Sequence, residues 1–422
     1  MAELSENARR VLAARYLIRD ERGRVVEDFE GMCRRVAHAV AAAEEAFGGD
    51  VERTAESFYA LLARREFLPN SPTLMNAGTE IGQLSACFVL PVEDSLLSIF
   101  DAVKRMALIH QSGGGTGFAF SRLRPAGDRV STTLDAASGP VSFLRVFDAT
   151  TEVIKQGGRR RGANMAVLRF DHPDIREFAR CKAEPGAIAN FNLSVGATDR
   201  FLRAAAAGER VDLVNPRDGK VVESADARAL LREIAVNAWT SGDPGLVFLD
   251  AVNRDNPTPQ LGPLEATNPC GELPLLPNES CNLGSLRLDA FAAEGAIDWE
   301  RLDAAVDLAV RFLDDVIEVN RLPFEELTRA ARASRKIGLG VMGFADLLVD
   351  LGVPYDSDAA VELAERAMSR IRARAEAASA ALAERRGTFP NFEGSRVQAR
   401  GCALRNATVT SVAPTGTISI IA

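Results

Sequence analysis

Hydrophobic and polar positions near the N-terminus follow a helical period. Residues 36–47 and 54–67 are rich in alanine and place acidic and apolar side chains at helical spacing. Both segments therefore predict amphipathic helices. Together with their charged surroundings, they indicate an N-terminal helical domain that spans residues 1–80.

From about residue 81 onward, short apolar runs alternate with longer amphipathic stretches. The apolar runs predict strands at residues 86–91, 117–120, 163–170, 190–196 and 245–249, and a β-branched run at 406–412. The amphipathic stretches predict helices at residues 140–156, 224–241, 299–319 and 356–386, and another with Leu97 and Phe100 that Asp94 is expected to cap. This alternation predicts an α/β fold with a largely parallel sheet, and the number of units favours a barrel over residues 81–422.

The last residues form a strand-like run, a glycine turn and a second apolar run at residues 418–421. A folded domain seldom ends on an unpaired apolar segment. The expectation is therefore a fragment, or one part of a split protein whose barrel a second chain completes.

Composition narrows the functional classes. The chain has 422 residues, of which 47% are hydrophobic and 26% charged, so a large core is expected. A net charge of −8 disfavours a nucleic-acid polymer as partner. The sequence shows no apolar signal segment and no run of membrane-spanning length, which predicts a cytoplasmic protein that does not bind membranes.

Six cysteines are spread along the chain without any Cys-x-x-Cys pair, and there are three histidines. This pattern predicts neither a disulfide scaffold nor a metal site. Reduced thiols leave catalysis or redox chemistry as the use for a cysteine. Cys33, Cys181 and Cys402 stand in ordinary helical or pre-strand patterns and are expected to pack.

Asn268, Cys270 and Glu272 alternate with Pro269 and Gly271. Proline disfavours a helix, so the segment is expected to be extended, with the three side chains on one face. An amide, a thiol and a carboxylate in one cavity suit the binding of a diol, hydrogen abstraction by sulfur and proton removal by a base. The alternative is a buried structural cysteine beside a turn.

Several motifs in the same order extend this pattern. The stretch at 268–272 is followed by Leu-Pro-Asn-Glu-Ser-Cys-Asn-Leu-Gly-Ser at 276–285; Ser-Ala-Cys stands at 85–87 and Pro-Thr-Gly-Thr-Ile at 414–418. In these motifs the chain resembles the catalytic chain of ribonucleotide reductases. The resemblance implies a ten-stranded α/β barrel, here lacking its last strands, behind an N-terminal helical domain.

The resemblance also implies roles for the residues. Cys270 would become a thiyl radical that takes the 3′ hydrogen of a ribonucleotide, Glu272 would be the base for the 3′ hydroxyl, and Asn268 would bind the substrate. Cys87 and Cys281 would supply two electrons and end as a disulfide.

Binding residues follow from the same resemblance. On their own, residues 414–417 would form a plain turn and residues 159–161 a solvated loop, and the glycine-rich 112–117 is no P-loop. The implied substrate contacts are Ser71, Ala86, Cys87, Arg161, Pro414, Thr415, Gly416, Thr417 and Ile418. The resemblance makes residues 414–418 the loop that binds the substrate phosphates, and residues 159–161 the loop that carries the identity of the effector to the substrate base. The implied contacts of a deoxynucleotide specificity effector are Asp94, Ser95, Leu96, Arg124 and Arg129.

The interval from Cys270 to Cys281 and the sequence around Cys281 are similar to the adenosylcobalamin-dependent type. The alternatives are the large subunit of an iron-dependent reductase, a glycyl-radical relative, and a catalytically incomplete fragment that binds deoxynucleotides. The family further implies a dithiol reductant such as thioredoxin and a homodimer. The sequence leaves open whether the substrate is a diphosphate or a triphosphate.

Overall fold

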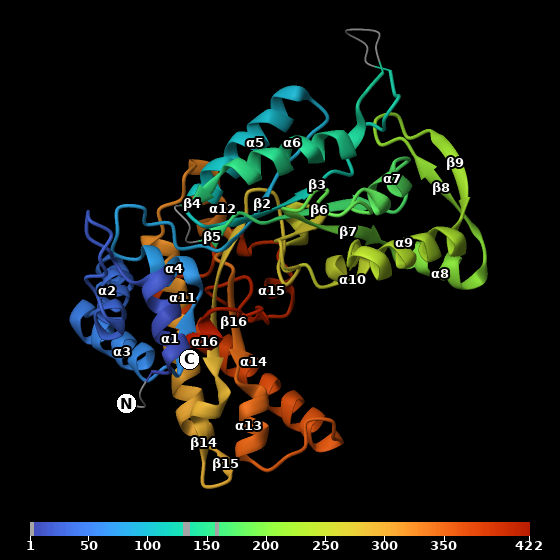
Figure 1. The fold of residues 1–422 in the computed structure, drawn as a ribbon. Coiled ribbons are helices and arrows are strands. Elements are labelled where there is room, and N and C mark those ends of the chain that lie inside the picture. The colour runs from blue at the N-terminus through green and yellow to red at the C-terminus, as the bar shows by residue number, and fades with distance from the viewer. Residues whose placement is uncertain (1–3, 130–135, 157–159) are drawn as a thin grey trace. The chain divides into compact units, whose positions relative to one another are not determined.

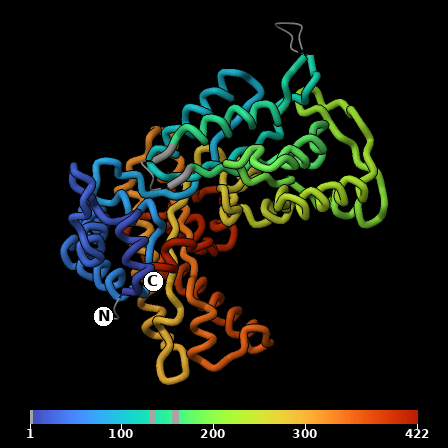
Figure 2. The backbone as a smooth tube through the Cα atoms, viewed as in Figure 1, coloured from blue at the N-terminus to red at the C-terminus, as the bar shows by residue number. Residues whose placement is uncertain are grey.

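The structure is a computed structural model that describes residues 4–129, 136–156 and 160–422 (Figures 1 and 2). The chain forms two compact units: residues 1–86 with 280–422 make the first unit, and Cys87–Glu279 makes the second. Each unit has its own core and is described separately.

The first unit begins with helices. Asp28 and Asp50 accept backbone N–H groups of Gly31 and Arg53 and so start two of them. The predicted helix at 36–47 is real only in part, because its α-helix ends at Ala41 and a 3₁₀ segment continues to a left-handed Gly48. The elements here are α1 (Glu6–Val11), a π-helical turn (Leu12–Tyr16), α2 (Phe29–Ala41), a 3₁₀ turn (Ala42–Phe47), α3 (Val51–Ala63) and α4 (Ser71–Asn76).

Three strands form the sheet of this unit. β13 (Ser280–Arg287) pairs antiparallel with β1 (Phe67–Pro69) and parallel with β16 (Ile337–Met342). The connection between the parallel strands contains α11 (Trp299–Val319), which matches the predicted helix and starts at the N-cap Asp298. Phe312 of α11 meets Phe58 and Phe67 edge to face, with ring centroids 5.0 and 5.5 Å apart, so the helices, α11 and the sheet share one core.

The rest of the first unit is mostly helical. The helix predicted at 356–386 is confirmed as α14, which Ser357 caps. The strand predicted at 406–412 is wrong: only one isolated bridge, from Leu339 to Thr410, forms there. The other elements are 3₁₀ turns (Leu288–Phe291 and Pro390–Phe392), β14 (Ala292–Ala293), β15 (Ala296–Ile297), α12 (Glu325–Ser334), α13 (Phe344–Asp350), α14 (Asp358–Arg386), α15 (Arg396–Ala399) and α16 (Ile418–Ile421).

The second unit is built on a parallel sheet, as predicted. Its strand order is β2 (Cys87–Leu90), β3 (Gly115–Ala119), β6 (Asn164–Arg169), β7 (Phe191–Ala197) and β10 (Gly245–Phe248), and every neighbouring pair is parallel. The first four strands are almost wholly buried, which explains their apolar sequences. The apolar run at 245–249 also predicted a buried strand, but β10 is partly exposed along its whole length, so the prediction is right for the strand and wrong for its burial.

Helices connect these strands, and α5 and α6 pack side by side (Figure 1). Side chains alternate along β3: Phe118 points to a cluster with Phe120, Phe147 of α6 and Phe191. Gly115 and Gly117 occupy the intervening positions. The elements are α5 (Leu96–Gln111), α6 (Gly139–Val153), β4 (Lys155–Gln156), β5 (Arg160–Arg161), α7 (Ile175–Arg180), α8 (Asp199–Ala207), β8 (Arg210–Val214), β9 (Val221–Asp226), α9 (Ala227–Ser241), α10 (Leu249–Arg254), a 3₁₀ turn (Pro259–Leu261), β11 (Ala266–Thr267) and β12 (Pro274–Leu275).

Candidate active site

The segment that carries Asn268, Cys270 and Glu272 is a hairpin turn between β11 and β12. The N–H of Asn268 donates to the carbonyl of Leu273 at 3.2 Å, and the N–H of Gly271 donates to the carbonyl of Asn268 at 3.1 Å. Gly271 has φ +84°, a conformation that glycine adopts without a Cβ penalty. The prediction of an extended segment is therefore wrong, because the glycine folds the chain back on itself.

The turn nevertheless brings three of the predicted residues together. The Asn268 side-chain amide donates to Glu272 Oε2 at 2.6 Å and to Cys87 Sγ at 3.1 Å. Cys87 Sγ lies 3.9 Å from Glu272 Oε1. The backbone N–H of Leu273 donates to Asn268 Oδ1 at 3.0 Å, so both ends of the amide are held. Asn268 is fully buried and Glu272 is half-buried.

Cys270 lies at the turn itself and is exposed. It stands between two residues whose side chains are fixed to one another, Asn268 and Glu272. The arrangement places an accessible thiol beside a buried amide and a carboxylate. It therefore offers the three groups that the sequence predicted, in a turn instead of a strand.

Two glycines of β3 make room for this turn. A Cβ on Gly117 would lie 1.7 Å from the carbonyl oxygen of Thr267, and one on Gly115 would lie 2.8 Å from Pro269 Cγ. On β7, the Asn192 side chain donates to the Pro269 carbonyl at 2.7 Å. Sequence analysis missed these positioning residues, although alternating glycines inside a strand are a signal of close backbone approach.

Cys281 belongs to the first unit, whereas Cys87 belongs to the second. Its side chain is buried in β13, and its S–H reaches the carbonyls of Asn282 at 3.3 Å and Lys336 at 3.4 Å. The pairing of Cys87 with Cys281 thus stays a prediction. Ala86, another predicted substrate contact, is buried and is the last residue of the N-terminal segment of the first unit.

The predicted phosphate loop and Ser71 meet within the first unit. Ser71 Oγ and Thr417 Oγ1 are 3.3 Å apart, although 346 residues separate them. Thr415 has φ +55°, which is unfavourable for a β-branched residue. Pro414 and Gly416 are exposed, and Ile418 is buried at the start of α16. Sequence analysis missed the third member, Tyr16, whose hydroxyl contacts both partners.

The predicted effector residues lie together at the start of α5. Arg124 Nη2 pairs with Asp94 Oδ2 at 2.8 Å, and Arg124 Nη1 donates to the carbonyl of Arg129 at 3.5 Å. Ser95, not Asp94, caps the helix by accepting the Ser98 N–H, because the Asp94 carboxylate is bound by Arg124. Leu96 follows with 63% of its surface exposed.

The predicted substrate-base loop is only partly described. Arg159 lies outside the described residues, and the prediction for the Arg161 side chain falls outside them as well. The backbone of residues 160–161 forms β5, which pairs antiparallel with β4.

The remaining cysteines fit a packing role. Burial raises the pKa of Cys33 and of Cys181 to about 12, which disfavours their reactive thiolates. Among residues 4–129, 136–156 and 160–422, no group of three or more His, Cys, Asp or Glu side chains could hold a metal ion. In the same ranges no helix is long and apolar enough to cross a membrane.

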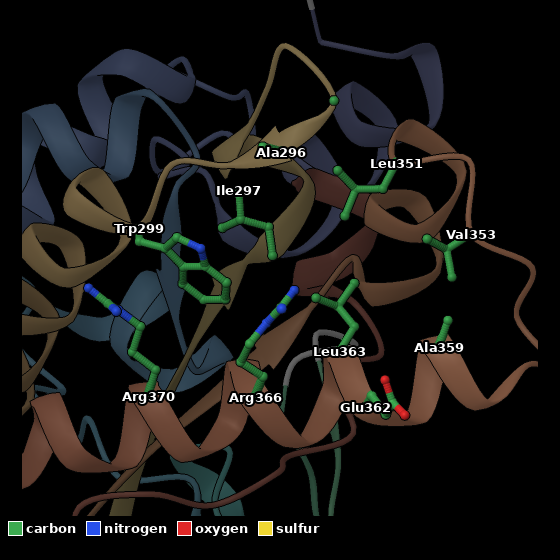
Figure 3. A pocket seen from close by; sticks show the side chains of 11 residues that line it. Ala296, Ile297, Trp299, Leu351, Val353, Ala359, Glu362, Leu363, Arg366 and Arg370 are labelled. Atoms are coloured by element: carbon green, nitrogen blue, oxygen red, sulfur yellow. The ribbon is translucent and has the colours of Figure 1, made fainter.

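A separate hollow of about 570 Å³ lies between the β14–β15 hairpin and α14 (Figure 3). The guanidinium of Arg366 points into it, with its central carbon 5.6 Å from the centroid of the Trp299 ring. Arg370 lies against the same ring at 5.3 Å. None of the predicted site residues lines this hollow, so it is not the candidate active site.

Comparison with known proteins agrees with the motifs. The family model "Ribonucleotide reductase, barrel domain" matches residues 85–403, and "Ribonucleotide reductase, all-alpha domain" matches residues 2–82. The chain belongs to the ribonucleotide reductase family. The predictions of this family, of its barrel domain and of a preceding helical domain are confirmed.

Two of the similar curated proteins carry the same name. The chain is 58% identical over all 422 residues to a vitamin B12-dependent ribonucleoside-diphosphate reductase of Mycobacterium tuberculosis (strain CDC 1551 / Oshkosh), and covers 61% of it. It is 48% identical to a protein of the same name from Thermoplasma acidophilum, all of the chain matching 62% of that protein. The predicted resemblance to the cobalamin-dependent type is thereby confirmed, and the chain spans 61% to 62% of the length of these relatives.

Proposed function

We propose that the chain carries the catalytic centre for reducing ribonucleoside diphosphates to 2′-deoxyribonucleotides, the precursors of DNA. The observation that carries this proposal is the cluster of Cys87, Asn268 and Glu272 beside the exposed Cys270. The diphosphate substrate is taken from the names of the similar proteins. The motifs support the same reaction, since each proposed group lies on one of them.

The chemistry follows from the groups present. A thiyl radical on Cys270 takes the hydrogen atom from C3′, while the Glu272 carboxylate accepts the proton of the 3′ hydroxyl. The 2′ hydroxyl leaves as water, and the Cys87 and Cys281 thiols supply two electrons and two protons and end as a disulfide. Cys270 then returns the hydrogen atom to C3′, and Glu272 returns its proton to the 3′ oxygen. Asn268 keeps the base and the Cys87 thiol in fixed positions through its two N–H donors.

Adenosylcobalamin is the cofactor we propose, and when bound it supplies the radical to Cys270. The fit rests on the exposure of Cys270, because a bulky group outside the core can reach its thiol. Within the chain, the turn presents Cys270, and the glycines of β3 let that turn approach the sheet.

The binding residues are part of the proposal. Ser71, Ala86, Cys87, Arg161 and residues 414–418 are proposed to bind the substrate, a role that the meeting of Ser71 with Thr417 supports. Asp94, Ser95, Leu96, Arg124 and Arg129 are proposed to bind a deoxynucleotide effector, supported by their grouping at the start of α5.

The proposal also covers the domain division, the partners and the location of the protein. We propose a helical domain of residues 1–80 and a catalytic domain of residues 81–422, supported by the family models, which meet between residues 82 and 85. A dithiol reductant such as thioredoxin, a homodimer, a second chain that completes the barrel and a cytoplasmic location are proposed from the family.

The test is anaerobic turnover of CDP with dithiothreitol, with and without adenosylcobalamin. The chain is assayed alone and with a polypeptide that supplies the remaining length of the relatives. Cys270→Ala is expected to reduce turnover to background while the melting temperature stays unchanged, because the side chain is exposed. Cys402→Ala, a matched cysteine outside the proposed centre, is expected to keep turnover.

Other outcomes would point elsewhere. Turnover by Cys270→Ala at the wild-type rate would contradict thiyl chemistry at this residue. Turnover that requires an iron-containing subunit in place of cobalamin would identify the iron-dependent type. Deoxynucleotide binding without turnover in either form would identify a binding protein.

A further inference from the structure

Three hydroxyl groups from distant parts of the sequence meet in the first unit. The Tyr16 hydroxyl donates to Thr417 Oγ1 at 2.6 Å and lies 2.8 Å from Ser71 Oγ. Ser71 and Thr417 are themselves 3.3 Å apart. The three side chains therefore form a closed triangle of hydroxyl groups at hydrogen-bonding distances.

The triangle has a buried corner and two more open corners. Tyr16 is 1% exposed, whereas Ser71 and Thr417 are half-buried. A ligand from solvent can therefore reach the serine and the threonine, while the tyrosine ring fills the core behind them. Tyr16 is placed by a π-helical turn, in which the N–H of Leu17 bonds back to the carbonyl of Leu12 at 3.1 Å. Such turns are uncommon and frequent at functional sites.

The direction of the hydrogen bond between Tyr16 and Thr417 indicates how Tyr16 acts on the Thr417 hydroxyl. Each hydroxyl has one proton to donate. Because the Tyr16 proton goes to the oxygen of Thr417, that oxygen acts as acceptor and the Thr417 proton remains to be donated elsewhere. A hydroxyl that accepts one hydrogen bond also becomes a better donor in the next. Tyr16 thus prepares Thr417 to donate toward an anion.

The loop around Thr417 is held in an unfavourable conformation. Thr415 adopts φ +55°, and its carbonyl accepts the N–H of Ser419 at 3.0 Å as α16 begins. A β-branched residue in this region costs free energy, and such strain concentrates at ligand sites. The strain and the hydroxyl triangle are independent features of the same loop.

We propose that Tyr16 is a positioning residue that orients the Thr417 hydroxyl toward the terminal phosphate of a nucleoside diphosphate. The proposal rests on the proposed function, which places the substrate at Ser71 and at residues 414–418, the loop that resembles the family's substrate-phosphate loop. Tyr16 does not touch the substrate. It acts through Thr417, so its contribution depends on the Thr417 hydroxyl.

The test measures ADP binding by calorimetry with the full chain, which requires neither turnover nor a cofactor. Tyr16→Phe removes only the hydroxyl, and it is expected to weaken ADP binding about fivefold to tenfold, as the loss of one hydrogen bond would. Adenosine, which lacks phosphate, is expected to bind both forms equally. Tyr59→Phe is the matched control. The Tyr59 hydroxyl also donates a hydrogen bond, to Glu30 at 2.7 Å, and this bond lies outside the hydroxyl triangle.

A double-mutant cycle separates positioning from general packing. In a Thr417→Val background, Tyr16→Phe is expected to change the ADP affinity less than about twofold, since no hydroxyl is left to orient. Thr417→Ser, which keeps the hydroxyl, is expected to retain the effect of Tyr16→Phe. Independent, additive losses would overturn the proposal.

Three further outcomes of the binding experiment would overturn the proposed role of Tyr16. A lower melting temperature of Tyr16→Phe with an unchanged ADP affinity would show a structural role and overturn the proposal. Absence of ADP binding by the wild-type chain would remove this proposal together with the proposed substrate site. Wild-type binding that Tyr16→Phe leaves unchanged would overturn the role of Tyr16 alone.

Discussion

The turn around Asn268 in the second unit and the charged cluster around Asp314 in the first unit bury polar groups in opposite ways. Asn268 joins one thiol and one carboxylate, and its neighbour Cys270 is exposed. Asp314 is completely buried and binds the guanidinium groups of Arg335 at 2.7 Å and Arg386 at 2.9 Å. The first arrangement keeps a side open to a reactant, whereas the second is sealed.

The sealed cluster extends across several elements. Arg405 and Asn406 also bond Asp314, and Arg386 reaches Glu44 at 2.6 Å. Although burial opposes it, the hydrogen bond from Arg311 and the charge of Arg386 lower the pKa of Glu44 to about 2. Charges buried with partners are costly to separate. The comparison teaches that substitutions in the Asp314 cluster should affect stability, whereas those at the Asn268 turn should affect turnover.

The largest effect is expected for Asp314→Ala. It leaves buried guanidinium groups without their carboxylate, and is expected to lower the free energy of unfolding by about 3–5 kcal/mol. Urea denaturation followed by circular dichroism measures this loss. Asp303→Ala, which breaks the more exposed pair with Arg370, is the control and should cost at most about 1 kcal/mol.

Equal losses in Asp314→Ala and Asp303→Ala would contradict this distinction between sealed and exposed charges. Turnover at background in an Asp314→Ala variant that is still folded would contradict the assignment of this cluster to stability.

Gly117→Ala tests how the second unit supports its turn. The added Cβ would meet the Thr267 carbonyl at 1.7 Å, so the β11–β12 hairpin must shift. A cost of about 1–3 kcal/mol is expected in the free energy of unfolding, with a loss of turnover because Asn268 follows Thr267 directly. Thermal unfolding and the CDP assay measure the two effects.

Gly245→Ala provides the matched strand glycine. Its Cβ would meet Ser194 Oγ at 3.5 Å and the Leu193 carbonyl oxygen at 3.9 Å, both ordinary contacts, so stability and turnover should stay near those of the wild type. If both variants behave alike, the close approach at Gly117 has no functional importance.

Local sequence patterns predicted the elements that local physics determines. α11 and α14 were predicted almost to the residue, because their helical periodicity begins at the capping residues Asp298 and Ser357. The parallel strands of the second unit were predicted because strands buried on both faces have continuous apolar sequences. The run at 406–412 has similar residues and hydrogen-bonds to the backbone of β16, yet only Thr410 forms a bridge and no continuous strand results.

The candidate site was predicted in its residues but not in its geometry. The motif identified Asn268, Cys270 and Glu272, while the left-handed Gly271 and the pairing with Leu273 determine the turn. Tyr16 could not be predicted, because 401 residues separate it from Thr417 and no local pattern covers that interval.

Asp315, next to Asp314, is the member of the charged cluster that is least satisfied. It is completely buried, and no hydrogen-bond partner in the described part of the chain reaches its Oδ2 atom. Burial raises the pKa of Asp315 well above its usual value, although the charge of Arg386 opposes this. The cluster thus contains one acid that favours its ionised form, Glu44, and one that favours its protonated form.

The two acids limit stability at opposite ends of the pH range. The contribution of Glu44 is present above its ordinary pKa of 4.5 and is lost as the pH falls toward about 2. The contribution of Asp315 is present below its ordinary pKa of 3.8 and is lost as the pH rises through its higher folded-state pKa. Stability should therefore fall on both the acid and the alkaline side.

The smallest change in the free energy of unfolding is expected for Asp315→Asn. It removes the alkaline loss but also weakens the contact of Asp315 with Arg386, at 2.6 Å, so two opposing changes largely cancel. The free energy of unfolding of the variant should vary less than that of the wild type as the pH rises from 4 to 9, whereas the acid loss through Glu44 should persist. Urea denaturation from pH 2 to pH 9 measures the acid and the alkaline loss in both proteins, with Asp303→Asn as the more exposed control on the same helix. A variant curve parallel to that of the wild type at every pH would show that the buried Asp315 does not carry the alkaline loss, and the contrast between the sealed cluster and the open turn would then rest on Asp314 alone.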